Sequence, residues 1–371
     1  MSRLLSNAPA AAVLVSAAAL ACAEPSSPNL ESTRAIDAAA IDAPTLEQQN
    51  SGTTQRLQAI SAVNADVAWA SGLGGTFTVT TNGGRRWRAG VVPGAETLQF
   101  RDVHGVSAKV AYLLAAGVGT DSRIYKTVDG GETWKLQFTA EQPNAFYDCF
   151  DFWTPNRALV MGDAVNGRLP VLRTRNGGEA WNRIGRLLPA AQAGEAAFAA
   201  SGTCLETLGT DHAWIATGAA ASARILATTD GGQTWKSYPT PIQPQGTPVS
   251  GLTTVAFRDT RHGIIAGGDV VATDREPNNV AVSDDGGKTW ELAKGTPFPG
   301  AAYGLSYAGA KDGEFVRTVV ITGPGGSAWS GNEGNSWHRL PDVDGFWAVA
   351  FADPQHGWLV GTEGRIVKVS F

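Results

Sequence analysis

The sequence predicts an all-β fold, a seven-bladed β-propeller with four strands in each blade, from three observations. An eight-residue pattern, S/T-x-D/N-x-G-x-x-W, recurs six times along the 371 residues. Its tryptophans are separated by 47, 47, 54, 55 and 47 residues, and a repeat of about 40–50 residues is the period of propeller blades. Glycine occurs 45 times and tryptophan 12 times, as expected for a β-protein with many tight turns and recurring aromatic packing sites.

Each repeat contains the same four strands in the same order. In the first repeat these are residues 57–63, 67–72 and 75–81, followed by a fourth strand that Trp87 opens. Apolar and polar residues alternate along them and β-branched residues are frequent, which is typical of strands rather than helices. Corresponding segments surround the other tryptophans, so the sequence predicts strands throughout the repeats and no helix.

The eight-residue pattern predicts a hairpin turn between the third and fourth strands. The Asp or Asn at its third position accepts backbone N–H groups inside the turn, and its glycines permit the positive φ that such a turn requires. The tryptophan buries its ring against the neighbouring sheet. We therefore expect the acidic groups of the pattern to be structural. The residues concerned are Asn82, Trp87, Asp129, Trp134, Asn176, Trp181, Asp230, Trp235, Asp285, Trp290, Asn332 and Trp337.

The last unit predicts how the ring closes. Residues 346–371 supply three strands, and the chain stops where the next turn would follow. The segment around Leu46 to Arg56, ahead of the first repeat, is expected to provide the missing fourth strand, because closure removes an exposed sheet edge. Six turns and one closing unit give seven blades, which occupy residues 46–371.

The N-terminal residues predict export. Residues 1–23 have the features of a signal peptide, with Arg3 ahead of an apolar core too short to span a bilayer. Cleavage after Ala23 would release a soluble periplasmic or secreted protein, whereas an imperfect lipoprotein box ending at Cys22 would leave a lipid anchor; both alternatives stay open. Residues 24–45, rich in Ala, Pro, Ser and acidic residues, are expected to form a flexible linker.

Charge and cysteine content narrow the classes of partner. The formal net charge is −5, with 17% charged residues, so no basic excess exists for nucleic acid or for anionic membranes. We expect a monomer without cofactor or metal.

Cys149 and Cys204 lie at similar positions in consecutive repeats, and an oxidising compartment would permit a disulfide between them. Two buried thiols are the alternative.

The motifs resemble a known family. Turns of the form T-x-D-G-G-x-T-W, with strands such as His262-Gly263-Ile264 and His356-Gly357-Trp358, resemble the BNR, or Asp-box, propellers of the photosystem II stability and assembly factor type. The resemblance covers roughly residues 46–371. It implies a non-catalytic binding or assembly protein with a protein partner in the cell envelope. Exported bacterial relatives often carry the label oxidoreductase or glycosyl hydrolase.

The alternative function is that of a sialidase-like glycoside hydrolase, or a lyase, acting on extracytoplasmic glycans. A sialidase-like site needs three arginines, a Tyr–Glu pair, an Asp acid and an R-I-P element before the first Asp box. The nearest match, Arg168-Leu169-Pro170, lies out of place in the third repeat.

Three histidines at one repeated turn position predict a turn role, because a metal site would need them to converge; they are His212, His262 and His356.

Propellers usually bind partners at the mouth of the central channel or on the loop face. First strands and nearby loops carry polar residues there, and residues 146–153 and 161–170 of the third unit have no counterpart in other repeats. No catalytic set is identifiable. The candidate binding residues are Arg101, Asp102, Tyr147, Asp148, Asp151, Asp163, Arg168, Glu206, Asp269 and Trp347.

Overall fold

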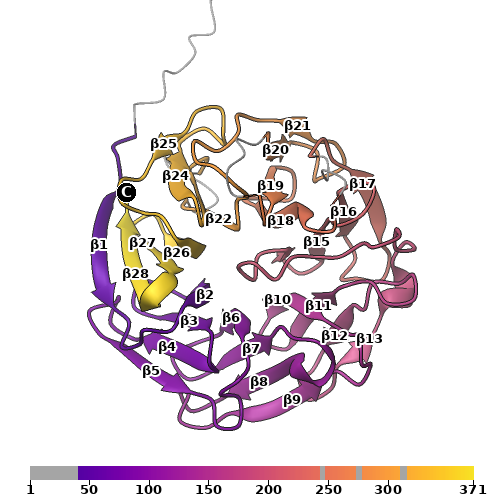
Figure 1. Cartoon of the computed structure of the whole chain (residues 1–371), viewed down its shortest axis with the longest axis horizontal. Coiled ribbons are helices and arrows are strands. Elements are labelled where there is room, and N and C mark those ends of the chain that lie inside the picture. The colour runs from indigo at the N-terminus through magenta and orange to yellow at the C-terminus, as the bar shows by residue number, and fades with distance from the viewer. Residues whose placement is uncertain (1–40, 243–246, 273–277, 310–315) are drawn as a thin grey trace, which may run out of the picture. The chain divides into compact units, whose positions relative to one another are not determined.

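The computed structural model describes residues 41–242, 247–272, 278–309 and 316–371. Seven antiparallel four-stranded sheets surround a central channel (Figure 1), which confirms the predicted seven-bladed propeller. The predicted signal peptide, Cys22 and residues 24–40 of the linker lie outside the described residues. Within the part of the chain that the structure describes, no helix has the length and apolar character needed to cross a membrane.

Blades 1 to 6 each consist of four consecutive strands that run in order from the channel to the rim (Figure 1). Blade 1 contains β2 (Leu57–Ala62), β3 (Ala68–Gly72), β4 (Thr76–Thr80) and β5 (Trp87–Val91); blade 2 contains β6 (Phe100–Gly105), β7 (Ala111–Ala115), β8 (Arg123–Thr127) and β9 (Lys135–Thr139); and blade 3 contains β10 (Tyr147–Thr154), β11 (Arg157–Gly162), β12 (Leu172–Thr174) and β13 (Asn182–Arg183). Blade 4 contains β14 (Leu205–Leu208), β15 (His212–Thr217), β16 (Arg224–Thr228) and β17 (Lys236–Pro239); blade 5 contains β18 (Ser250–Phe257), β19 (Gly263–Asp269), β20 (Val280–Ser283) and β21 (Glu291–Leu292); and blade 6 contains β22 (Gly304–Tyr307), β23 (Val319–Gly323), β24 (Gly326–Ser330) and β25 (His338–Arg339).

Blade 7 is shared by the two ends of the propeller. Strands β26 (Phe346–Asp353), β27 (His356–Gly361) and β28 (Arg365–Ser370) are completed at the rim by β1 (Thr45–Asn50). Strand β1 pairs antiparallel with β28, Thr45 opposite Ser370 and Asn50 opposite Arg365. The predicted closure by N- and C-terminal strands is confirmed.

The hydrophobic core is divided among the seven interfaces between blades, each with a cluster drawn from two neighbouring sheets. The tryptophan that ends each Asp box belongs to these interfaces. Trp134 of blade 2 packs on Trp69 and Phe77 of blade 1, with ring centroids 6.2 and 5.1 Å away. Trp87 of blade 1 meets Trp358 of blade 7 at 6.4 Å, so the same contact also joins the ends of the ring.

The six Asp boxes share one hydrogen-bond pattern. The first-position hydroxyl accepts the N–H of the fifth residue, and the third-position Asp or Asn accepts the N–H of the seventh. Bonds from the hydroxyl and the N–H of Thr133 hold the pKa of Asp129 at about 2. Each box acid is therefore engaged by its own turn.

The sixth box departs from the pattern at Glu333, which takes the place of a glycine at φ +54°. A non-glycine residue in this region carries backbone strain. The Glu333 carboxylate accepts hydrogen bonds from Arg258 Nε at 2.6 Å, Arg317 Nε at 2.9 Å and the Tyr307 hydroxyl at 3.0 Å. Since Arg258 belongs to blade 5, the strained residue ties blade 6 to its neighbour.

Candidate functional site

The connection between β13 and β14 carries a segment, residues 196–204, that reaches into the channel; we call it the plug. In Figure 1 it is the loop that enters the centre of the ring from the side of β15. Its Ser201 hydroxyl donates to the Tyr303 carbonyl of the blade 6 side at 2.7 Å, and its Thr203 carbonyl accepts the Val255 N–H of blade 5 at 3.0 Å. Blades 5 and 6 thus hold the plug in place.

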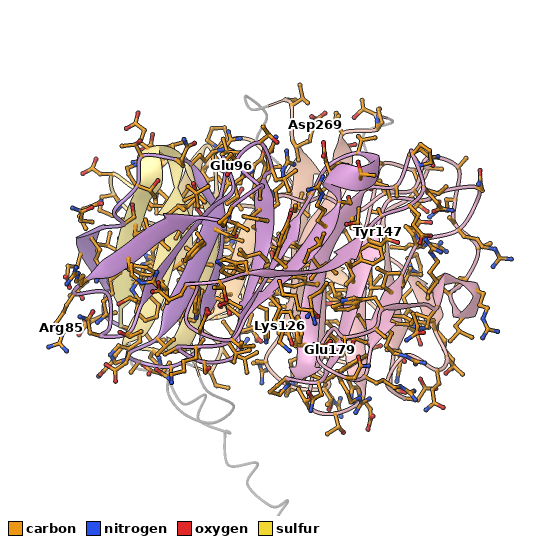
Figure 2. All side chains as sticks on the ribbon, turned by 90° about the horizontal axis from the view of Figure 1, so that it is seen from below. Arg85, Glu96, Lys126, Tyr147, Glu179 and Asp269 are labelled. Carbon is orange, nitrogen blue, oxygen red and sulfur yellow. A yellow bond between two sulfur atoms is a disulfide. The ribbon has the colours of Figure 1, made fainter. Side chains whose placement is uncertain are left out.

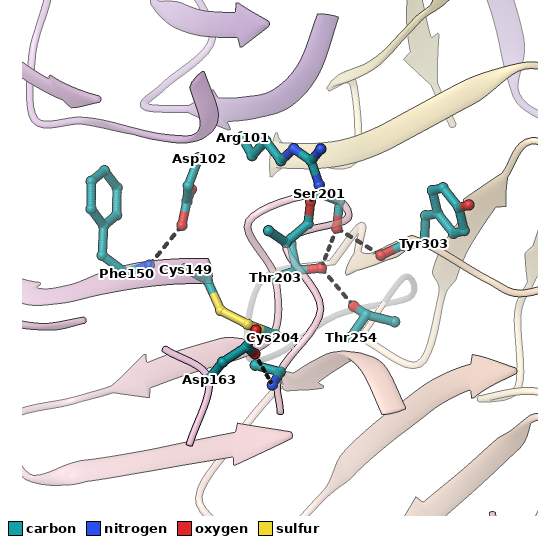
Figure 3. The surroundings of a disulfide bond; sticks show 12 residues. Arg101, Asp102, Cys149, Phe150, Asp163, Ser201, Thr203, Cys204, Thr254 and Tyr303 are labelled. Carbon is teal, nitrogen blue, oxygen red and sulfur yellow. Dashed lines mark hydrogen bonds between the residues drawn. A yellow bond between two sulfur atoms is a disulfide. The ribbon is translucent and has the colours of Figure 1, made fainter. Parts of the chain in front are cut away.

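A disulfide fixes the end of the plug to blade 3. Cys204 is bonded to Cys149 of β10, with the two Cα atoms 6.1 Å apart, and both residues are fully buried (Figure 3). On the blade 2 side, Gly202 passes so close to Asp102 that a Cβ would lie 2.3 Å from Oδ1. Only glycine fits there, and the plug is consequently seated against four blades besides its own.

The plug lies between two cavities. The first, which we call the channel cavity, has a volume of about 470 Å³ and is lined by the innermost strands of all seven blades and by plug residues 201–203. The second, the mouth pocket, has a volume of about 230 Å³. It is lined by plug residues 198–200 and by Arg56, Gln58, Arg101, Val270, Tyr303 and Trp347.

The mouth pocket opens at the end of the ring away from the Asp boxes. Val270 of the pocket follows Asp269, which Figure 2 places at the opposite end of the ring from Glu179 of the third Asp box. The Asp269 carboxylate accepts the N–H groups of Val271 and Ala272 at 2.9 and 2.8 Å. This candidate residue therefore shapes the loop at the mouth and is engaged by its own backbone.

Two guanidinium groups dominate the mouth pocket. Arg101 donates to Gln99 Oε1 at 2.7 Å and to the plug carbonyl of Ala199 at 3.3 Å. The Arg56 guanidinium lies 4.6 Å from the centre of the Trp347 ring. Neither arginine has an ion-pair partner within 4.0 Å in the described ranges, and burial together with the Arg56 charge lowers the pKa of Arg101. The pocket thus presents concentrated positive charge.

The rest of the pocket offers an unused acceptor and an aromatic wall. Gln58 is 2% exposed, and its Oε1 has no hydrogen-bond partner in the part of the chain that is described. Tyr303 and Trp347 pack edge to face with ring centroids 5.5 Å apart. Because a buried amide oxygen without a donor costs free energy, the site is suited to a ligand that brings an N–H group.

A buried pair of carboxyl groups lies beside Arg101. Burial and the neighbouring Asp163 raise the pKa of Asp148 well above its usual range, and burial raises the pKa of Asp163 to about 6. Two such carboxyl groups share a proton near neutral pH. The pair therefore cannot neutralise both arginines, and the mouth remains positive.

The three acidic candidates in the channel cavity join neighbouring blades. Asp102 Oδ2 accepts the Phe150 N–H of the next blade at 2.7 Å (Figure 3). Asp151 Oδ2 accepts the Thr207 N–H at 2.6 Å, and Glu206 Oε2 accepts the Phe257 N–H at 2.6 Å. Burial and the charge of Asp151 raise the pKa of Glu206 well above its usual range. These acids line the cavity, but each holds the innermost strand of the following blade.

Two further candidates lie away from the channel. The Tyr147 ring is 2% exposed and packs edge to face on Phe138 at 5.4 Å, in the interface between blades 2 and 3. Arg168 is exposed and lines a separate pocket on blade 3. Of the ten candidate residues, the structure thus brings Arg101 and Trp347 together in the mouth pocket.

Sequence reasoning missed Arg56, Gln58, Tyr303 and the plug. The available signal was the spacing between Trp181 and Trp235, which is 54 residues instead of 47. The extra length lies in the connection that contains the plug. Across the described ranges, no group of three His, Cys, Asp or Glu side chains is arranged to hold a metal ion.

Comparison with known proteins agrees with the repeat and the fold. Residues 281–292, which include the fifth Asp box, match the BNR/Asp-box repeat model. The structure is similar to that of YCF48 bound to D1 peptide, with 16% identity, a TM-score of 0.62 and coverage of 90% of this chain and 97% of the other. YCF48 from Cyanidioschyzon merolae gives 16% identity, a TM-score of 0.60 and coverage of 89% and 99%.

A propeller outside the Asp-box group is also similar. The WD40 repeats of RRP9 match with 10% identity, a TM-score of 0.58 and coverage of 89% of this chain and 99% of that chain. No curated protein sequence matches the chain. At these identities the likeness concerns the fold, and the predicted resemblance to Asp-box propellers of the assembly-factor type is confirmed at that level.

Proposed function

We propose that this chain is a non-catalytic binding propeller that takes an acidic segment of a protein partner in the mouth pocket. The observation that carries the proposal is the combination, within the described residues, of two guanidinium groups without an ion-pair partner within 4.0 Å, Arg56 and Arg101, and the unpaired acceptor of Gln58. A ligand that carries both a negative charge and an N–H donor would pair with the guanidinium groups and with the amide oxygen at the same time.

A peptide has the required chemistry. Guanidinium groups bind carboxylates through two parallel hydrogen bonds, and a peptide N–H can reach an amide oxygen such as that of Gln58. Tyr303 and Trp347 offer an aromatic surface for an adjoining apolar side chain. A pocket of about 230 Å³ has room for one or two residues, so an acidic side chain or a C-terminal carboxylate is the part of the partner that enters.

Two further observations support a binding role. YCF48, whose propeller has the same fold, is described as bound to a D1 peptide, although a shared fold does not carry a shared ligand. In the channel cavity, Asp102, Asp151 and Glu206 each accept a backbone N–H of the next blade. Carboxylates with this structural task favour a non-catalytic protein over a glycoside hydrolase, which needs two of them free to act on a sugar.

The test is affinity capture from the native envelope with three forms of the protein. We expect the wild type to retain a specific protein and Arg56→Gln/Arg101→Gln to lose it. The control variant Arg85→Gln/Lys288→Gln removes the same positive charge from two Asp boxes, and we expect it to bind as the wild type does.

Peptides from the captured protein then test the chemistry. Those that contain an acidic residue or a free C-terminus should bind about tenfold more tightly than their neutral, amidated counterparts. Equal capture by both double variants would contradict the proposal. A glycan that binds in the absence of any protein partner would favour the hydrolase alternative instead.

We also propose that the protein is exported to the periplasm or beyond. The buried Cys149–Cys204 disulfide supports this, because such bonds persist in oxidising compartments. The mass of the mature N-terminus distinguishes the two forms: a start at Glu24 indicates a soluble protein, and a lipid-modified Cys22 indicates an anchor. An unprocessed Met1 in the cytoplasmic fraction would contradict export.

A further inference from the structure

A second basic pocket, of about 370 Å³, lies on blade 3 and contains the Arg168-Leu169-Pro170 element. Its lining residues are distinct from those of the mouth pocket and of the channel cavity. The proposed partner segment in the mouth pocket makes no use of it. We call it the blade 3 pocket.

Three arginines reach the blade 3 pocket from three short segments. Arg168 follows a tight turn in which Asn166 and Gly167 have φ of +53° and +73°, the Asn-Gly geometry of a rigid two-residue hairpin. Arg183 belongs to β13, and Arg186 lies in the 3₁₀ turn 185–187. The backbone therefore fixes the three points from which the arginine side chains extend.

Close packing holds two of these segments together. Gly185, at the start of the 3₁₀ turn, approaches the Leu169 carbonyl so closely that a Cβ would lie 2.2 Å from the oxygen. Leu169 is 1% exposed and Val171 is fully buried. The floor of the pocket is thus apolar and firmly packed, while its rim is cationic.

The positive charge at the rim is largely uncompensated. In the described ranges, the side chains of Arg168 and Arg186 make no ion pair and no hydrogen bond. Arg183 pairs with Glu141 at 3.1 Å, but the two side chains are 54% and 79% exposed. Exposed pairs of this kind contribute little free energy and exchange readily. Arg183 also interacts with the Tyr147 hydroxyl, so Arg168 and Arg186 are the two guanidinium groups most available to an anion.

We propose that the blade 3 pocket binds a small organic anion, a carboxylate or phosphate monoester attached to an apolar group. The guanidinium groups suit the planar carboxylate or the phosphate oxygens. Pro170, which is partly exposed, offers the apolar group a contact surface above the packed Leu169 and Val171. A volume in this range is that of a small-molecule site.

Two charged probes and two controls test the pairing of head group and apolar group. Hexanoate and phenyl phosphate are titrated into the full chain by calorimetry, with contact confirmed by saturation-transfer NMR. Hexanamide keeps the apolar chain without the charge, and acetate keeps the charge without the chain. We expect both controls to bind at least about tenfold more weakly than hexanoate.

Three double variants locate the binding. Arg168→Gln/Arg186→Gln should weaken hexanoate and phenyl phosphate at least about tenfold. Arg85→Gln/Arg175→Gln, which removes equal charge from exposed Asp-box positions, should bind as the wild type does. Arg56→Gln/Arg101→Gln should also bind normally, which separates this pocket from the mouth.

The proposal is overturned if neither anion binds the wild type, if hexanamide equals hexanoate, or if Arg168→Gln/Arg186→Gln binds unchanged. The side chains of Arg168, Arg186, Arg85 and Arg175 are exposed, so thermal unfolding of the two variants at these positions should match that of the wild type. If Arg168→Gln/Arg186→Gln unfolds early, Arg168→Lys/Arg186→Lys replaces it, because it keeps the positive charge and removes the guanidinium groups. Weakened binding of the anions would support recognition by the guanidinium groups, and unchanged binding would contradict it.

Discussion

The acidic residues of the Asp boxes and those of the channel accept backbone N–H groups in opposite environments. Asp285 lies in an exposed turn. Its slight burial raises the pKa of the carboxyl group, but the hydrogen bonds from Thr289 and Ser283 lower it by more, so the net pKa is lowered. Glu206 faces the channel, where burial raises its pKa well above the usual range. The same chemical group thus responds to pH in opposite directions at the two places.

In the exposed turn, we expect Asp285→Ala to lower the free energy of unfolding by roughly 1 kcal/mol at pH 7, as the loss of a comparable helix cap does. A lowered folded-state pKa stabilises the fold above the unfolded value of about 4 and loses that contribution as pH falls below it. The deficit of the variant should therefore shrink as pH falls below about 4. Urea unfolding at pH 7, 4 and 3 measures it.

Asp284→Ala is the matched control for that experiment. Asp284 precedes Asp285 in the same box and is exposed, and its side chain has no hydrogen bond in the described structure. It should cost less than about 0.5 kcal/mol, as surface substitutions usually do. Equal costs for the two variants would mean that the Asp285 carboxylate does not hold the turn.

In the channel, we expect Glu206→Gln to be at least as stable as the wild type at pH 7 and above. The amide oxygen keeps the acceptor for the Phe257 N–H, which Glu206 now binds at 2.6 Å. A raised folded-state pKa means that the wild type loses stability as pH rises above the unfolded value of about 4.3. The advantage of the variant should grow between pH 5 and pH 8 in urea unfolding.

Glu206→Ala provides the contrast for this prediction. It removes the acceptor and leaves the Phe257 N–H unpaired, which costs about 1–3 kcal/mol. If Glu206→Gln were as damaging as Glu206→Ala, the negative charge itself would matter in the channel. That result would return the glycosidase alternative to consideration.

At the scale of elements, the plug depends on a covalent tie to blade 3. Cys149 and Cys204 enclose a loop with a sequence separation of 55 residues, and closure of such a loop is worth about 2–4 kcal/mol. We expect Cys149→Ala/Cys204→Ala to lose free energy of unfolding in that range. Amide hydrogen exchange within residues 196–204 should accelerate, because this tie no longer restrains the plug.

Mass spectrometry of the purified wild type checks the premise, since a bridged pair gives no thiol adducts unless a reductant is added after unfolding. Reduction of the folded protein should be slow, because both cysteines are fully buried. A variant with unchanged stability and unchanged exchange would show that the hydrogen bonds from blades 5 and 6 suffice to hold the plug.

At the scale of the whole molecule, β1 closes the ring through backbone pairing and one shared side chain. Gln49 Oε1 accepts the indole N–H groups of Trp87 and Trp358 at 3.0 and 3.2 Å. Removal of residues 1–50 would expose the edge of β28 and leave both indoles without an acceptor. We expect a lower unfolding temperature and self-association, because an unpaired edge pairs with other chains.

Light scattering after gel filtration and thermal unfolding measure this effect. A chain without residues 1–40 keeps β1 and serves as the control. Addition of a synthetic peptide of residues 41–50 should restore the monomer and part of the unfolding temperature. A truncated chain that remains monomeric with an unchanged midpoint would show that the interface between blades 1 and 7 closes the ring by itself.

The sequence by itself determined the architecture of this protein. Each Asp box uses hydrogen bonds between residues no more than four positions apart. A short stretch of sequence is therefore enough to recognise each turn, and the number of turns can be counted from the sequence. The spacing of the boxes then gives the blades. The missing fourth strand after Arg365–Ser370 pointed to the N-terminal segment because a sheet edge needs a partner.

Only the tertiary structure showed the mouth pocket. Arg56, Gln58, Arg101, Tyr303 and Trp347 come from four different parts of the ring. Gln58, Arg101 and Trp347 share one position, the bulge near the start of the innermost strand of their blades, but only ring closure brings the five residues into one pocket. The repeat spacing shows the extra length of the connection that contains the plug, but not that this segment turns into the channel. Asp102, Asp151 and Glu206 appear free in the sequence because their partners lie 48, 56 and 51 residues further along the chain, on the next blade.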